Sequence, residues 1–544
     1  MATTAPTLSK YELGEPEPRA SVEPGTQAEP RRSYDDDPDD GDEQAGLLNQ
    51  EKVMRRARAG SMLSFDLSNR LLLQASEEVG EPSSAGTSLR KPNESVSLTA
   101  GIALIVGLTI GSGIFASSGI VARETGSVGA ALVVWVFAGF LSWAGGSSLA
   151  ELGTALPMNG GAQAYLSAAY GPLPSYCFSF TAVTALKPGS QAIISIIGAE
   201  YICRILWHTA FSSDPRAAAR GVPTLAIKGV AIICLVLVSA LQAWSTKAGT
   251  RAQIVVTAFK VIAIVVIFIG GIVWLGLGRV ASDFAFDGEP SATGLALALF
   301  SALWAYDGFD QANYVARDCK PGALPKMINI SLALIVVLFV LANVAYCIVL
   351  PFNVVSATST IGLDFGRAIG GAIGAVIFAL IVGISCIGAL NSSLYTSSRL
   401  VVAAGEQGFL PKVFSEFNSR RQTPINGLIL SSSLSIVFIL LGDFSNLTLF
   451  YGVTAWFWNL CVVVGLLVLR VREPTLKRPY RTWLSTPILF ASTALFLLVL
   501  SCFSKPWQSL AAFMFCGAGT VPYYFQVRRN RGIEREATEG LEMT

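Results

Sequence analysis

Charged residues are scarce in this sequence. Asp, Glu, Lys and Arg make up 14% of its 544 residues, whereas hydrophobic residues make up 52%. A soluble globular protein is about a quarter charged, so the composition excludes an ordinary soluble protein. The net charge of +2 gives no indication of a nucleic-acid partner. Many of the charges fall in residues 1–96, and long apolar runs follow, which is typical of a multi-pass membrane protein with a polar tail.

Metal ligands and catalytic side-chain sets are also missing. The sequence has a single histidine, His208, and none of its nine cysteines stands in a Cys-x-x-Cys pair. Most of these cysteines lie in apolar runs, where a free thiol behaves as a small hydrophobic side chain. We therefore predict no metal site, no cofactor and no enzymatic activity. Because the N-terminus is acidic, we expect no cleavable signal peptide and expect the first spanning helix to direct insertion.

The apolar runs predict an all-α protein with twelve transmembrane helices. They lie near 98–121, 128–156, 173–203, 223–243, 252–276, 294–315, 327–351, 369–401, 425–442, 445–469, 484–503 and 507–526. We expect a disordered tail over 1–96, a transport core of ten helices over 97–480, two further helices over 481–527 and a second tail over 528–544. Lys and Arg gather in alternate loops, which places those loops and both termini in the cytoplasm.

The first span is interrupted at its centre by Gly111-Ser112-Gly113-Ile114. Glycines weaken a continuous helix, and a break inside a bilayer is tolerated where the freed backbone groups line a cavity or meet a ligand. The N-terminus of a half-helix carries positive partial charge and suits a carboxylate. We predict that the N–H groups of Ser112, Gly113 and Ile114 bind one. The alternative is close helix packing, because Gly107 and Gly111 have a GxxxG spacing.

A second break falls within 294–315, where Asp307, Gly308 and Asp310 occupy the middle of an apolar run. A carboxylate there faces a cavity, finds a partner or is protonated. Asp307 is expected to attract a substrate ammonium or accept a transported proton, or else to cap a half-helix. Asp310 is a second candidate for these roles, or faces the cytoplasmic vestibule. If the two breaks are equivalent, the core consists of two inverted five-helix repeats.

Lys260 lies inside an apolar run without an acid in its own span. We expect its ammonium to bond the carbonyls of the broken helix and hydroxyls such as that of Ser385, where a cation would otherwise sit; the alternative is snorkelling to the interface. Glu151 and Glu200 are expected to be interfacial and structural. Aromatic side chains that could wall a pocket are Phe115, Trp304, Tyr306, Phe309, Trp456, Phe457 and Trp458.

An ordered set of motifs resembles the amino acid–polyamine–organocation (APC) superfamily and, within it, the L-type amino acid transporter group. The motifs are Gly111-Ser-Gly-Ile-Phe115, Ala150-Glu-Leu-Gly153 with Gly160-Gly161, Tyr170-Gly-Pro-Leu-Pro174, Lys187-Pro-Gly-Ser-Gln191, Trp304-Ala-Tyr-Asp-Gly308, Asn391-Ser-Ser-Leu-Tyr-Thr-Ser-Ser-Arg399 and Leu476-Lys-Arg-Pro479. The resemblance covers about residues 97–480 and implies a LeuT-like fold.

The resemblance also implies roles for residues at the breaks. The substrate carboxylate would meet the N–H groups of Ser112 and Gly113, and the amino group would meet backbone carbonyls. Trp304 or Phe309 would act as an outer gate. The implied substrate-binding residues are Thr109, Ile110, Gly111, Ser112, Gly113, Ile114, Trp304, Ala305, Tyr306, Asp307 and Phe309. The residues expected in ion or proton coupling are Lys260, Asp307, Asp310 and Ser385, and a lysine at 260 is similar to that of sodium-independent members.

The sequence departs from the animal members of this group in one respect. Those members pair with a heavy chain through a cysteine after the third span, but residues 206–222 contain no cysteine. We therefore expect a single chain, similar to fungal members such as methionine permeases. The tail would suit ubiquitination at Lys10, Lys52 or Lys91. The segment 43–48 fits an acidic dileucine signal, which leaves a vacuolar address open beside the plasma membrane.

The resulting prediction is a sodium-independent transporter of neutral L-amino acids that works by alternating access, through proton coupling or exchange. Two alternatives stay open. The long tail fits an amino acid sensor with little transport, and the two acids of the second break fit a carrier of amines or polyamines.

Overall fold

The computed structural model describes residues 96–207, 221–287, 291–320, 322–418, 420–421, 423–442 and 444–525, without the side chains of 444–449. The predictions for the tail over 1–95, for His208 and for residues 528–544 fall outside this part of the chain. Within it the protein is all-helical, with an isolated backbone bridge between Val96 and Cys319 and no strand.

The helices follow one another with short connections. In chain order they are α3 (Leu98–Thr109), α4 (Gly113–Thr125), α5 (Val128–Ala155), α6 (Ala162–Tyr170), α7 (Pro172–Thr181), the π-helix η2 (Ala182–Leu186), α8 (Lys187–Leu206), α10 (Thr224–Trp244), α11 (Thr246–Gly276), α12 (Ala292–Ala305), the 3-10 helix η4 (Gln311–Asp318), α13 (Ala323–Val349), α14 (Phe352–Ala357), α15 (Ile361–Glu406), the 3-10 helix η5 (Lys412–Phe414), α16 (Ile425–Leu441), α17 (Phe444–Arg472), α18 (Ser485–Ser504) and α19 (Pro506–Ala518).

Each of the twelve predicted spans contains a helical element. Eight helices of the described chain are long and apolar enough to cross a membrane, and the bent pair α3 and α4 makes a ninth span. The other three predicted spans hold shorter helices, namely α12 with η4, α16 and α19. The predicted start at 369 corresponds to a kink inside α15, where Gly370 and Gly371 leave helical geometry and Gly371 has φ +59°.

Serine side chains begin several of these helices. Ser97, Ser127, Ser245 and Ser291 each accept a hydrogen bond from the backbone N–H three residues later, at the starts of α3, α5, α11 and α12. A serine oxygen at this position satisfies one of the N–H groups that the first helical turn leaves unpaired. The boundaries of these spans are therefore fixed by local chemistry as well as by the apolar runs.

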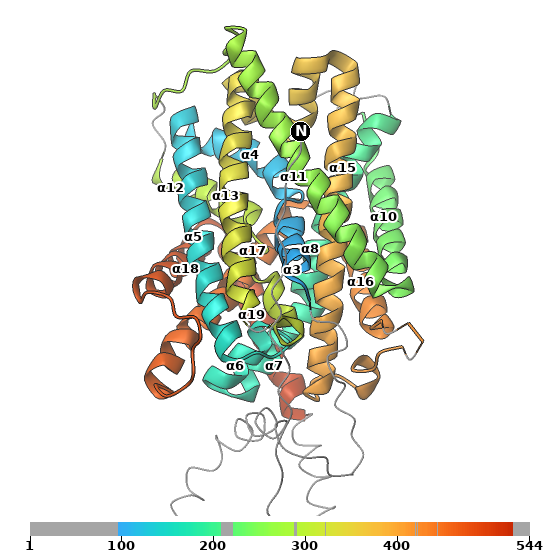
Figure 1. The fold of residues 1–544 in the computed structure, drawn as a ribbon, viewed down its shortest axis with the longest axis vertical. Coiled ribbons are helices and arrows are strands. Elements are labelled where there is room, and N and C mark those ends of the chain that lie inside the picture. The colour runs from blue at the N-terminus through green and yellow to red at the C-terminus, as the bar shows by residue number, and fades with distance from the viewer. Residues whose placement is uncertain are drawn as a thin grey trace, which may run out of the picture. The chain divides into compact units, whose positions relative to one another are not determined.

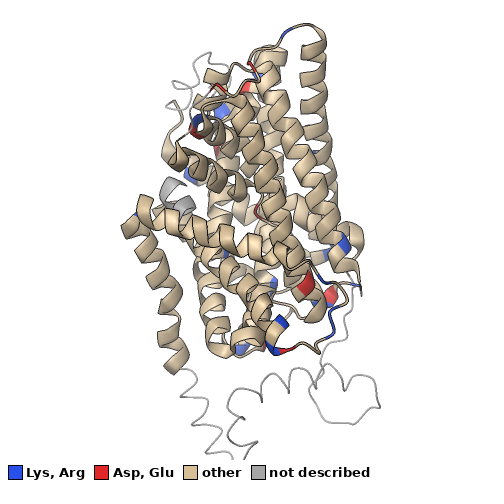
Figure 2. Ribbon diagram, turned by 90° about the vertical axis from the view of Figure 1, so that its left-hand side faces the viewer, with Lys and Arg blue, Asp and Glu red and all other residues tan. Residues whose placement is uncertain are grey.

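The broken spans lie inside the bundle. Figure 1 shows the long helices α5, α11, α13 and α15 running side by side, with α3 and α4 among them. α3 packs against α11, α13 and α15, and α4 packs against α12. The outward faces carry large exposed apolar side chains, such as Leu225 and Leu237 on α10, and charged residues gather toward the helix ends (Figure 2). This distribution suits a surrounding bilayer.

Candidate functional site

The first break has the predicted geometry. α3 ends at Thr109, Ile110 leaves helical geometry with ψ 66°, and α4 starts at Gly113 after a bend of 43°. The glycines also permit close packing, because a Cβ atom at Gly111 would lie 2.7 Å from Cβ of Ala389. The break is therefore confirmed. The alternative role of these glycines, close helix packing, is also observed, because Gly111 packs against Ala389 of α15.

The second break crosses the first. α12 ends at Ala305, and a turn with Gly308 at φ +125° leads into η4. A Cβ atom at Gly308 would lie 2.6 Å from Oγ1 of Thr109, and one at Gly113 would lie 2.6 Å from Cα of Ala305. Only glycine adopts this φ without strain and leaves this space. The inner half of the second span is a 3-10 helix, a form that proteins use in short pieces.

Side-chain donors form hydrogen bonds with the backbone carbonyls that the first break leaves without helical partners. The Lys260 ammonium, on a side chain that is 1% exposed, donates to the Gly107 carbonyl at 2.6 Å. The Ser385 hydroxyl contacts the carbonyls of Ile110 at 3.0 Å and Gly111 at 3.3 Å. A helix leaves its last four carbonyls without partners, so these contacts satisfy groups that would otherwise be bare. Lys260 does not snorkel, and its ammonium binds a carbonyl of the broken helix as predicted. The expected bond to the Ser385 hydroxyl is not found, because this hydroxyl donates to the carbonyls of Ile110 and Gly111 instead.

The two acids of the second break have partners from other helices. The Tyr451 hydroxyl of α17 donates to the Asp307 carboxylate. Asp310 accepts from the Gln311 amide at 2.6 Å and lies 3.9 Å from the Lys187 ammonium of α8. The capping alternative is wrong for Asp310, because its side chain makes no capping hydrogen bond at the start of η4.

A cavity opens beside these acids. Asp307, Asp310, Lys187 and Tyr451 all line it, together with apolar and aromatic residues of α5, α6, α7, η2, η4 and α17. Its volume of about 40 Å³ holds a few waters, since one water needs roughly 10–15 Å³. The residues of the first break, 109–114, are buried and do not line it. The acids therefore border accessible space, whereas the predicted carboxylate site lies packed against α12.

A further polar group of this cavity, the side-chain amide of Asn313, forms a hydrogen bond through its oxygen alone. The side-chain oxygen of Asn313 accepts from the Tyr165 hydroxyl at 2.9 Å, but its amide nitrogen has no hydrogen-bond partner within the described part of the chain. A buried donor without a partner is costly. The cavity wall thus presents carboxylates, an ammonium and an unused amide donor, a combination that suits a small polar solute.

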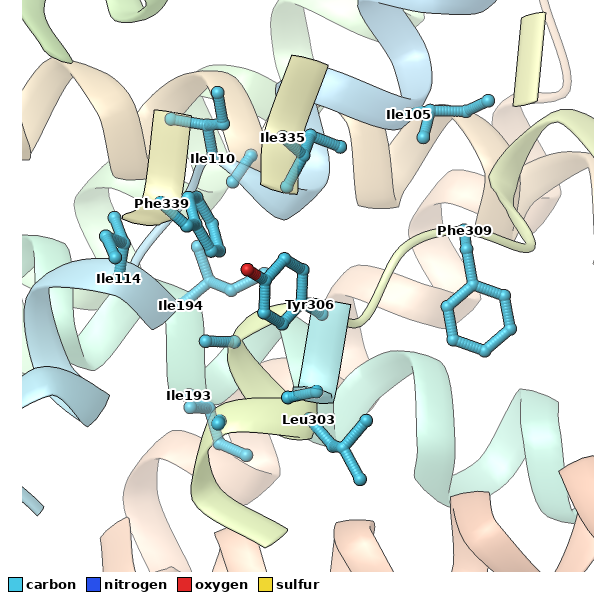
Figure 3. Packing of buried hydrophobic residues seen from close by; sticks show 14 of the residues in the cluster. Ile105, Ile110, Ile114, Ile193, Ile194, Leu303, Tyr306, Phe309, Ile335 and Phe339 are labelled. Carbon is cyan, nitrogen blue, oxygen red and sulfur yellow. The ribbon is translucent and has the colours of Figure 1, made fainter. Parts of the chain in front are cut away.

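The predicted aromatic residues take different positions. The Tyr306 ring turns toward α5 and α13, where its hydroxyl donates to the Trp135 carbonyl at 3.1 Å and its ring lies 4.9 Å from that of Phe339 (Figure 3). Phe309 points away from this cluster and packs edge-on against Phe490 of α18. Of the seven aromatic candidates, Trp458 lines the cavity.

Lys187 and Tyr451 are site residues that were not predicted from the sequence. Lys187 offered a signal, because a cation inside an apolar run needs a partner; its ammonium also lies 4.0 Å from the centre of the Tyr314 ring. Tyr451 offered none, since tyrosine is common in spans and its partner Asp307 is 144 positions away.

Comparison with known proteins agrees with this arrangement. The profile of the amino acid permease family matches residues 96–520. The b(0,+)-type amino acid transporter 1 of Mus musculus is 34% identical over 466 residues, covering 84% of this chain and 93% of its own. The cystine/glutamate transporter of Homo sapiens is 31% identical over 433 residues (79% and 84%). The large neutral amino acids transporter small subunit 2 of Homo sapiens is 32% identical over 464 residues (83% and 83%).

These matches and the two crossing breaks lead to one conclusion. A twelve-helix arrangement whose first and sixth spans are interrupted near their centres is the LeuT-like fold expected of the APC superfamily. The chain is an integral, multi-pass membrane protein that belongs to the amino acid permease family of that superfamily.

Proposed function

We propose that this protein transports neutral L-amino acids independently of sodium, by alternating access around the two crossing breaks. The observation that carries the proposal is the Lys260 ammonium on the Gly107 carbonyl, with Ser385 on the next freed carbonyls. Carbonyl and hydroxyl oxygens are the ligands that a sodium ion takes, and here a fixed cation already occupies them. Proton coupling or exchange then drives transport.

The substrate would bind through both breaks. Its carboxylate would meet the N–H groups at Ser112 and Gly113, and its ammonium the carbonyls of Thr109, Trp304 and Asp307. This requires α4 and α12 to separate slightly, because Gly113 now abuts Ala305. The substrate side chain would extend toward the cavity beside Asp307 and Tyr451.

The charges of the cavity favour a neutral side chain. Asp310 is matched by Lys187, and Asp307 is bonded to Tyr451. The second candidate, a carrier of amines or cationic amino acids, is supported by the excess of two carboxylates over one ammonium. Competition of labelled leucine uptake by methionine, arginine and spermidine separates the two, since the neutral proposal expects methionine alone to compete strongly.

The test of the sodium claim uses the purified chain in liposomes. Uptake of a labelled neutral amino acid should be unchanged when potassium replaces sodium outside. Lys260→Ala should lower uptake or change its pH dependence, because it removes the cation from the freed carbonyls. The variant Lys228→Ala is a control, since Lys228 is only partly buried and binds the Leu440 carbonyl at the end of α16. Strong sodium dependence of the wild type would refute the role of Lys260.

We also propose that the chain works without a disulfide-linked partner, although one relative is named a small subunit. The cysteine nearest the 206–222 loop is Cys203, which is buried in α8 and not available for such a bond. The purified chain alone should therefore be active. Residence in the plasma membrane, cytoplasmic termini and trafficking through the N-terminal tail are parts of this proposal. Deletion of residues 1–90, with flux and signalling both measured, separates a transporter from a sensor: a transporter keeps its flux, whereas loss of signalling from a chain with little flux of its own would favour the sensor.

A further inference from the structure

We propose that Gln253 of α11 is a positioning residue that latches α11 to α3, the inner half of the first broken span, and thereby holds the Gly107 carbonyl on Lys260. The role as a latch rests on the proposed alternating access, whereas the contact itself does not.

One face of α11 carries three side chains that form hydrogen bonds with the backbone of α3. Gln253, Thr257 and Lys260 follow one another at positions i, i+4 and i+7, and all three are buried. The Gln253 amide and the Thr257 hydroxyl both donate to the Ala103 carbonyl at 3.1 Å. Lys260 donates to the carbonyl one turn later, at Gly107. Three donors of one helix therefore bind the backbone of the other in register.

The amide oxygen of Gln253 connects this contact to two more helices through hydrogen bonds. Its amide oxygen accepts from the Asn391 amide of α15 at 2.7 Å, and the Asn391 oxygen accepts from the Gln242 amide of α10 at 2.7 Å. A chain of amides thus runs from α10 through α15 and α11 to α3. Both ends of the Gln253 amide are used, and Gly107 leaves room for it, because a Cβ atom there would overlap the Gln253 nitrogen.

The hydrogen-bonded contact between α11 and α3 is suited to break and re-form. Interlocked apolar side chains must repack when helices separate, but a carbonyl that loses a side-chain donor can bond water instead. The seam lies toward the end of α11 predicted to be cytoplasmic, below Lys260. When α3 leaves α11, the Lys260 contact is lost with it, which links the inner seam to the carbonyls of the break.

A natural cysteine reports on the position of α3. Cys319 follows η4 and pairs with Val96 just before α3. Its thiol lies 3.3 Å from the Val315 carbonyl, and burial, with a smaller contribution from Asp318, raises the thiol pKa to about 12. Cys319 is partly buried and packs in the cluster formed by Leu104 of α3, Val315 and Tyr395. The thiolate is the reactive form, so we expect Cys319 to react faster when α3 moves away and water enters.

The experiment measures maleimide labelling of Cys319 in the full chain, reconstituted in liposomes, with Cys319→Ser defining the label at this site. Gln253→Leu should raise the labelling rate roughly fivefold, the factor that corresponds to one ordinary hydrogen bond. Gln253→Glu should behave similarly, because it keeps the acceptor and loses the donor. Gln191→Leu is the matched control, since Gln191 is equally buried but binds Ser431 and Ser435 of α16.

If Gln253→Leu does not fold, Thr257→Val removes the other donor to Ala103 with little change of shape and should raise the rate by a smaller factor. Wild-type labelling rates in all folded variants, or an equal rise in Gln191→Leu, would overturn the proposal. Labelling needs no substrate, so an absence of sodium-independent flux would refute the proposed function without touching this result.

Discussion

At the scale of single residues, the ionisable groups inside this bundle are held by specific partners. Glu151, which the sequence predicts near the membrane interface in a structural role, is 0% exposed and therefore buried within the protein. Its carboxylate accepts from the Arg470 guanidinium at 2.9 Å and from the backbone and hydroxyl of Thr482. Arg478 lies 3.7 Å away on the same side. The pair ties α5 to the end of α17 and to the segment before α18, which agrees with the structural role expected for Glu151.

Loss of this carboxylate should be severe. Glu151→Gln leaves Arg470 buried without its counter-charge, which costs about 3–5 kcal/mol when one partner of a buried pair is removed. We expect a clear fall in Tm of the purified protein, measured by thermal unfolding in detergent. Glu124→Gln is the control, because Glu124 pairs with an exposed Arg123 and exposed pairs contribute about 0–1 kcal/mol. Equal shifts in both variants would contradict this account.

At the scale of helices, the close contact of α4 with α12 depends on Gly113, which has no side chain. Gly113→Ala would place Cβ 2.6 Å from Cα of Ala305, and neither backbone can yield as a flexible side chain would. Overpacking of this kind costs about 1–3 kcal/mol. We expect roughly a tenfold loss of uptake rate in liposomes, since the penalty falls on the conformations in which the breaks touch.

The matched control for this substitution is Gly229→Ala. Gly229 lies inside α10, and a Cβ atom there would meet nothing within 4 Å. Alanine is the better helix former by about 1 kcal/mol, so uptake should be unchanged and stability equal or higher. A Gly113→Ala variant with wild-type uptake would show that the two breaks do not need this close approach.

The elements also show what a sequence can predict. Both breaks were predictable, because glycines and carboxylates are costly inside an apolar membrane span unless the helix is interrupted there. The burial of Lys260 followed from its distance to the helix end. The contact of Tyr451 with Asp307 was not predictable, nor was the amide chain from Gln242 to Gln253, because these depend on how far each helix is rotated about its axis. Rotation is set by packing among several helices and leaves little trace in one sequence.

At the scale of the whole molecule, each of the two breaks places polar groups inside an apolar bundle, with Lys260 on the first and the cavity beside the second. The freed carbonyls are bonded by Lys260 and Ser385, and the acids of the second break border the cavity. The helices that contribute are α3, α8, α11, α15, η4 and α17, which come from every part of the core. A solute bound at this meeting point would be in contact with segments that must move relative to one another.

Binding of the proposed substrate should therefore stabilise the entire fold. A ligand present at 100 times its Kd adds about 2.7 kcal/mol to the free energy of unfolding. We expect a neutral amino acid such as leucine or methionine to raise Tm in detergent, equally in sodium and in potassium, and to do so less in Lys260→Ala. Spermidine should have no effect. A rise with spermidine alone would instead favour the amine carrier, because the Asp307 and Asp310 carboxylates would then be what the ligand binds.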